Sequence, residues 1–169
     1  MSATRKMALT GLVLFTGMAM LLALAASSWA QGPPVTGTGT GILVQEPEVL
    51  DSREAGNNRI ETRELIVELE GALEGTFTQE VRGVVSADGQ VRFQGTGEFE
   101  GTLEGCGEGT SHFRLNGRGQ AGEFPDFPAT TVNAAVVDQA SSTLPATGRG
   151  TFSQTGPFLT YEIQYVCHN

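Results

Sequence analysis

The stretch QVRFQGTGEFEGTLEGCGEGTSHFRLNG, residues 90–117, decides the fold of this chain. Between residues 91 and 104 the odd positions are apolar or glycine, and the even positions are polar or charged. Because successive side chains of a β-strand point to opposite faces, this period of two indicates a long antiparallel strand with one apolar and one acidic face. The glycine-rich turn at 105–107 then leads into a second alternating run.

The first thirty residues have the pattern of a cleaved export signal. Arg5 and Lys6 supply positive charge, the run 12–26 is apolar, and Ser28-Trp29-Ala30 places small residues before a cut between Ala30 and Gln31. The apolar run of about fifteen residues is shorter than the roughly 20 needed to span a bilayer, which disfavours the alternative of a retained anchor. We therefore predict a secreted or periplasmic protein with no stable membrane span after cleavage.

Residues 31–169 have the length of a single domain. The whole chain carries a formal charge of −9, and loss of Arg5 and Lys6 leaves eight arginines against nineteen acidic residues, a charge of −11. Nucleic acid and anionic membrane surfaces are therefore not expected as partners. The acidity is typical of a solvated surface on an exported protein, and a cationic ligand is the alternative.

Two cysteines remain in this domain, Cys106 and Cys167. They have one intramolecular pairing available, and an exported protein matures in an oxidising compartment, so we predict a disulfide between them. Together with His112 and His168 they do not form the ligand set of a zinc site. No metal ion and no cofactor is expected.

The rest of the domain contains further strand-like stretches and no stretch with helical periodicity. Asp88-Gly89 predicts a tight hairpin turn, whereas 45–58 and 118–129 are interpreted as long surface loops. Hairpin-linked strands that contain many glycines favour a closed eight-stranded antiparallel up-and-down β-barrel, and a two-sheet sandwich is the alternative. The eight predicted strands are 35–44, 59–70, 73–85, 90–104, the run around Phe113 and Leu115, 130–140, 148–154 and 158–168.

In such a barrel, alternate turns lie at opposite ends. Both long loops, 45–58 and 118–129, then fall at one end, which we interpret as the mouth. Cys106 and Cys167 fall together at the other end, which supports their pairing because a disulfide requires Cα atoms within about 7 Å.

Four glycine-rich and turn motifs carry a family resemblance: Gly-Thr-Gly within 37–41, Phe-Glu-Gly-Thr-Leu-Glu-Gly at 99–105, Gly-Arg-Gly-Thr-Phe at 148–152 and Leu-Thr-Tyr-Glu-Ile-Gln-Tyr at 159–165. In this order they resemble small bacterial proteins of unknown function that belong with the allene oxide cyclase-like barrels, a calycin-like fold that is also similar to dirigent proteins. The resemblance implies a lumen that can hold a small apolar molecule, within a homo-oligomer such as a trimer or dimer.

In the plant cyclases that this chain resembles, catalysis is attributed to polar and acidic groups near the first strand and the loop after it. Glu46, Glu48 and Asp51 occupy that region here, but none aligns with the plant motif, so no catalytic residue is assigned. Inward glycines such as Gly95 and Gly97 remove side-chain volume and favour a cavity.

Two groups of residues are the candidate binding site. The predicted lumen residues are Phe77, Phe93, Phe99, Phe113, Phe152, Tyr161 and Tyr165. The predicted mouth residues are Glu46, Asp51, Phe124 and Phe127. The main functional hypothesis is an exported barrel that binds a small hydrophobic or amphipathic molecule. The alternatives are an intramolecular cyclase or isomerase and a structural or protein-interaction module.

Overall fold

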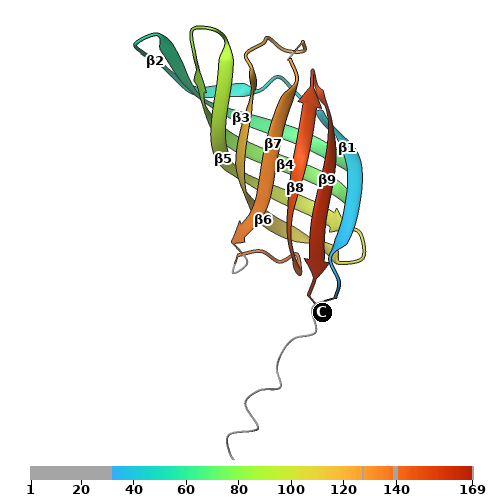
Figure 1. Ribbon diagram of the computed structural model, residues 1–169. Helices are drawn as coiled ribbons and strands as arrows, with labels where there is room; N and C mark the ends of the chain where they lie inside the picture. Colours follow the sequence, from blue (N-terminus) through green and yellow to red (C-terminus); the bar gives the residue numbers. More distant parts are fainter. Residues whose placement is uncertain (1–31, 127, 139–140, 169) are drawn as a thin grey trace, which may run out of the picture. The chain divides into compact units, whose positions relative to one another are not determined.

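The computed structural model describes residues 32–126, 128–138 and 141–168, which form an all-β structure (Figure 1). The predicted export signal, its cut after Ala30 and the candidate mouth residue Phe127 lie outside these ranges. Within them, no helix is long and apolar enough to cross a membrane. The strands are β1 Val35–Leu43, β2 Glu48–Ala55, β3 Asn58–Gly71, β4 Leu73–Val85, β5 Gln90–Leu103, β6 Gly107–Gln120, β7 Thr130–Asp138, β8 Ala146–Thr155 and β9 Phe158–Cys167.

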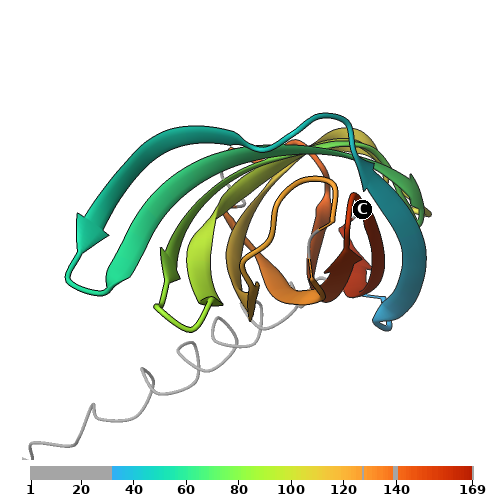
Figure 2. The ribbon, with the colours of Figure 1, turned by 90° about the horizontal axis from the view of Figure 1, so that it is seen from above.

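Eight of these strands close into an antiparallel barrel in the order β1-β9-β8-β7-β6-β5-β4-β3. The closing contact lies between β1 and β3, where Gly39 is opposite Gly71 and Leu43 is opposite Val67. Viewed from above, the strands curve around a common axis (Figure 2). The predicted eight-stranded barrel is confirmed, and the two-sheet sandwich is excluded.

The prediction of a long loop over 45–58 was wrong, because most of it is strand β2. Glu48–Ala55 pairs with the first half of β3, from Glu64 back to Asn58. Strand β3 is longer than its pairing with β1, so β2 covers backbone groups of β3 that would otherwise form an open edge. The β2–β3 hairpin extends beyond the barrel wall (Figures 1 and 2). All eight side chains of β2 are exposed, so this strand has no apolar face that would reveal it in the sequence.

The alternation in β5 has the predicted consequence for burial. Its odd residues point into the barrel, and Phe99 is completely buried, whereas the even residues Glu98 and Glu100 are exposed. Phe99 lies opposite Phe77 of β4. The ring of Phe77 also contacts those of Phe113 and Phe152, with centroids 5.4 and 5.9 Å away. These rings form the centre of an apolar core in the lower part of the lumen.

The inward glycines do not open the lumen, contrary to the expectation from their small size. A Cβ atom on Gly97 would lie 2.5 Å from the ring of Phe77, and one on Gly95 would overlap the carbonyl oxygen of Glu80. Gly39 is covered in the same way by the ring of Tyr161. Each glycine therefore makes room for a neighbouring strand or ring, and that volume is already occupied.

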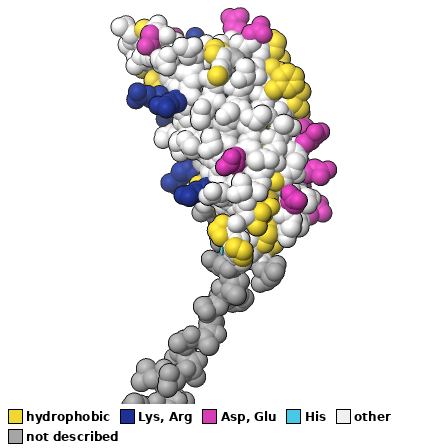
Figure 3. All heavy atoms as spheres, turned by 45° about the vertical axis from the view of Figure 1, so that its right-hand side comes forward, with side chains coloured by type: hydrophobic (Ala, Val, Ile, Leu, Met, Phe, Trp, Pro, Cys, Tyr) yellow, Lys and Arg dark blue, Asp and Glu magenta, His cyan; other side chains and the backbone are white. Residues whose placement is uncertain are grey.

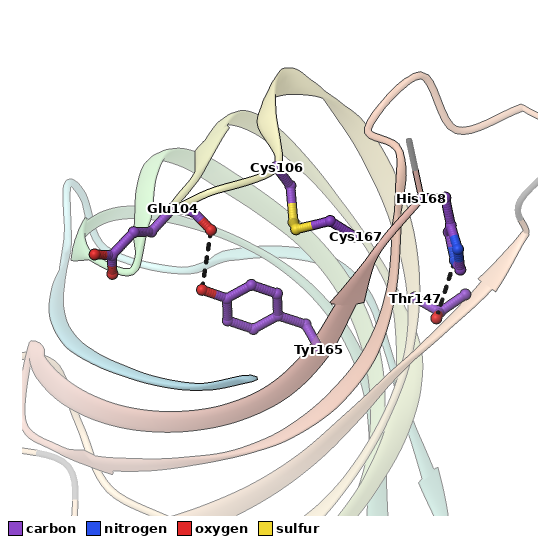
Figure 4. Close-up of a disulfide and its surroundings, with 6 residues drawn as sticks. All are labelled: Glu104, Cys106, Thr147, Tyr165, Cys167 and His168. Carbon is purple, nitrogen blue, oxygen red and sulfur yellow. Dashed lines mark hydrogen bonds between the residues drawn. A yellow bond between two sulfur atoms is a disulfide. The ribbon is translucent and has the colours of Figure 1, made fainter. Parts of the chain in front are cut away.

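The predicted disulfide closes the end of the barrel where β1 begins and β9 ends. Cys106, in the β5–β6 turn, is bonded to Cys167, the last residue of β9, with 5.2 Å between their Cα atoms. The Tyr165 hydroxyl donates a hydrogen bond to the backbone carbonyl of Glu104 beside it, at 3.0 Å (Figure 4). The disulfide fits an oxidising, extracellular environment.

Tyr161 of β9 connects the wall to the β3–β4 turn. Its hydroxyl accepts a hydrogen bond from the Leu73 amide at 2.7 Å and lies 3.0 and 3.1 Å from the carbonyl oxygens of Leu73 and Glu70. Burial raises the pKa of Tyr161 above its ordinary value of 10.0. The neutral hydroxyl both accepts from the Leu73 amide and donates to a backbone carbonyl, whereas the phenolate could accept from the amide but could no longer donate.

Replacing Tyr161 by phenylalanine is expected to lower the free energy of unfolding by about 1–3 kcal/mol, because the buried Leu73 amide loses its acceptor. A tyrosine whose pKa is raised by folding stabilises the protein fully below the unfolded value of about 10, and this stabilisation is lost as the pH rises further. Urea unfolding between pH 8 and 11 should therefore show a shallower alkaline loss for Tyr161→Phe. Identical profiles for the two proteins would contradict this role.

Candidate functional site

A cavity of about 150 Å³ lies at the upper end of the barrel, opposite the disulfide. Odd residues of β3, β4 and β5 form most of its wall, and the two predicted mouth segments reach it through Pro47 and through Gln120–Gly122. Polar and apolar residues both line it: Pro47, Arg59, Glu61, Arg63, Leu65, Gln79, Val81, Gly83, Val85, Val91, Phe93, Gln120, Ala121, Gly122, Thr130, Val132 and Gln154.

The cavity ends where the packed core begins. Leu65, Val81 and Phe93 line it and also pack against the buried core cluster. Below them, the open space around Phe113 and Phe152 amounts to about 20 Å³. The lumen therefore offers space for a small molecule at the mouth and not along its whole length.

Three charged side chains from β3 stand together in the cavity wall. Glu61 is 9% exposed and accepts from two arginines. One of its carboxylate oxygens lies 2.6 Å from Arg59 Nε. The other lies 2.9 Å from Arg63 Nε and 2.8 Å from an Nη atom of the same guanidinium. Alternate residues of a strand share a face, so β3 places all three side chains on the inner side.

The charge inside the cavity differs from the charge outside it. Two arginines and one glutamate give the lining a formal charge of +1, and Glu61 is the only acidic residue among those that line it. The whole chain carries −9. On the face shown in Figure 3, most acidic side chains lie along the right-hand flank and at the upper end, and most basic side chains lie on the left-hand flank. An anion that enters the cavity would therefore meet a net positive lining on a protein whose overall charge is negative.

Of the seven predicted lumen residues, only Phe93 lines the mouth cavity. The other six are buried in the packed core below it: Phe77, Phe99, Phe113, Phe152, Tyr161 and Tyr165. Their inward direction was predicted from alternation. Whether an inward side chain reaches the open part of the lumen depends on its height in the barrel, which alternation along one strand does not give.

Three of the predicted mouth residues, Glu46, Asp51 and Phe124, do not line the cavity. Glu46 and Asp51 are exposed, and Asp51 pairs with Thr62 on the β2–β3 hairpin. Phe124 is half-buried and packs against the core cluster. In the part of the chain that the structure describes, no group of three or more His, Cys, Asp and Glu side chains is arranged to hold a metal ion.

Sequence reasoning missed the charged residues of the cavity: Arg59, Glu61 and Arg63. Their parity is visible in the sequence, because they occupy the same odd positions of the strand as the apolar residues Leu65, Val67 and Leu69. Charged side chains seldom lie inside a protein, so a sequence pattern alone predicts them on the outer face of a strand. Gln79 and Gln154 also line the cavity. Each occupies an inward-facing position of its strand, and Gln154 lies near the end of its strand.

Comparisons with known proteins give information on the fold of this chain and not on its function. No protein-family model and no curated protein matches the chain. Among solved structures, the chain is similar to a protein of unknown function from the DUF3224 family of Shewanella oneidensis MR-1, with a TM-score of 0.62 and 18% sequence identity. The similarity covers 81% of this chain and 98% of that one. It supports the barrel fold, and the resemblance to allene oxide cyclase-like proteins stays a prediction.

Proposed function

We propose that this β-barrel binds a small amphipathic molecule in its mouth cavity. The observation that carries the proposal is the position of the Arg59–Glu61–Arg63 cluster in the wall of a cavity that also has apolar residues, among them Val81, Phe93 and Val132. A concave site with an apolar lining and a few convergent polar groups is the usual form of a small-molecule site.

The cavity volume restricts the size of the ligand. A cavity of about 150 Å³ lined by apolar side chains is large enough for a benzene ring. The mouth cavity also has a volume of about 150 Å³, which is below the usual range for larger ligands of about 300–1,000 Å³. The proposed ligand therefore has a single ring or a short chain inside the barrel, and any further part of it extends into solvent.

Gly83 provides the most direct test of this proposal. A Cβ atom there would make ordinary contacts of 3.5–3.9 Å with Val91, Phe93 and Arg92, so a side chain can enter the cavity without backbone overlap. Gly83→Leu is expected to lower the affinity for phenol, benzyl alcohol and benzoate at least tenfold by filling the cavity. Ligand-observed NMR and calorimetry can measure this loss.

The matched control for Gly83→Leu is Val84→Leu, because Val84 is the next residue of β4 and is exposed. This variant should bind the same compounds as the wild type. Binding that is unaffected by Gly83→Leu would place the ligand elsewhere. If the wild-type protein binds none of the single-ring compounds, the proposed function is wrong.

The second candidate function is an intramolecular cyclase or isomerase, as the resemblance to allene oxide cyclases implies. Glu61 favours it to a limited degree, since it is a buried acid in the cavity wall. Both of its oxygens already accept bonds from arginine, which suits anchoring better than proton donation. Chromatography of an unsaturated epoxide incubated with the protein tests this candidate, and Glu61→Gln should abolish any rearrangement that Glu61 catalyses.

A further inference from the structure

We propose that the ligand of the mouth cavity is a small organic anion, a single-ring or short-chain carboxylate whose head group binds Arg59 and Arg63. The inference rests on the proposed function and adds the charge and orientation of the ligand to it. Four observations support it: the balance of charge, the remaining donors, the direction of polarity along the cavity and the rigidity of the arginines.

The side chains that line the cavity carry a net positive charge. Two guanidinium groups face one carboxylate, and no other acidic side chain lines the cavity. Arg63 and Arg59 have partly exposed side chains, at 30% and 45%, whereas that of Glu61 is 11% exposed. One more negative charge would neutralise the cluster. A cation would instead add to the existing excess of positive charge.

Unused hydrogen-bond donors remain on both arginines. A guanidinium has five N–H donors, and carboxylate groups match two of them at once. Arg59 contacts Glu61 through Nε, and Arg63 through Nε and one Nη atom. Among the described residues, Glu61 is the only side-chain ion-pair partner of either arginine. Donors on the remaining Nη atoms are therefore available to a second carboxylate.

Along β3 the cavity lining changes from charged at the rim to apolar at the floor, where Leu65 lies opposite Gln79 of β4. On β3 the lining changes from Arg59, Glu61 and Arg63 to Leu65 within one strand face. Leu65 packs against the core, as do Val81 and Phe93 on the neighbouring strands. A ligand with a carboxylate at one end and an apolar body at the other fits this order, with its body toward the floor.

Glu61 acts as a positioning residue for the two arginines. Bonds of 2.6–2.9 Å to Arg59 and Arg63 hold long side chains that would otherwise sample many rotamers. They also offset the repulsion between two like charges on one strand face. Binding an anion to preoriented guanidinium groups requires less ordering than binding to free ones. The overall negative charge of the protein opposes the anion only weakly, since ionic screening limits it to about 8 Å at physiological salt.

The test compares benzoate, benzamide and benzylamine, which share one ring and differ in charge. Calorimetry with the purified wild-type protein at pH 7.5 should show benzoate binding about tenfold or more tightly than neutral benzamide, with benzylammonium weakest. Equal affinities for benzoate and benzamide would overturn the anion proposal while leaving the proposed function intact. Absence of binding by all three would overturn both.

Variants of Arg63 locate the effect. Arg63→Met keeps the apolar stem and should weaken benzoate about tenfold or more, with little change for benzamide. Arg63→Lys should retain part of the preference for benzoate.

The control is Arg82→Met, because Arg82 is exposed on β4 next to the lining residue Val81 and does not line the cavity. If Arg82→Met lowers benzoate affinity as much as Arg63→Met, the anion responds to overall charge and the assigned site is wrong. The wild-type comparison decides the charge preference even if one variant does not fold.

Discussion

Replacing Cys106 and Cys167 together by alanine is expected to lower the free energy of unfolding by about 4 kcal/mol. The two residues are 61 positions apart in the chain, so their bond removes a large amount of conformational freedom from the unfolded state. Urea unfolding followed by circular dichroism should show the loss as a lower midpoint with a similar native spectrum. Thermal unfolding should shift downward by roughly 10–20 °C.

The control for the cysteine variant is the wild-type protein under reducing conditions, which breaks the same bond without changing a side chain. It should show a similar loss of stability. Benzoate affinity of the folded double variant should equal that of the wild type, because the disulfide and the mouth cavity lie at opposite ends of the barrel. A loss below about 1 kcal/mol in both experiments would mean that the disulfide contributes little to holding the fold.

Phe99→Ala is expected to destabilise the protein by about 3–5 kcal/mol, the cost of removing a buried aromatic ring and leaving a cavity. Phe99 is completely buried and lies opposite Phe77, in the centre of the packed part of the lumen. The same urea titration measures the change. Because the core fills the space around this residue, the neighbouring rings can collapse only partly into the gap.

Glu100→Ala is the matched control for Phe99→Ala. Glu100 is the next residue of β5, has an exposed side chain and lies on the outer face. Its replacement should change the free energy of unfolding by less than about 0.5 kcal/mol. Similar losses for the two variants would show that the alternation in β5 does not decide which side chains stabilise the barrel.

Much of the fold could be predicted because period-two alternation is a local property. In β5, it reveals which side chains point inward, and the Asp88-Gly89 signal identifies the β4–β5 turn. The same reasoning failed for β2, whose exposed side chains leave no apolar face. It also failed for Arg59, Glu61 and Arg63, because inward charged residues are rare and were not distinguished from outward ones.

The sequence by itself determined the inner and outer faces of strands such as β5 and the pairing of Cys106 with Cys167. Those features depend on alternation along single strands and on the order of turns. Only the tertiary structure decided where the lumen is filled and where it is open. Phe77 covers Gly97 and Tyr161 covers Gly39 because of the register between strands, and the same register leaves the mouth cavity open beside Glu61. Register is a relation between strands, so a single strand cannot reveal it.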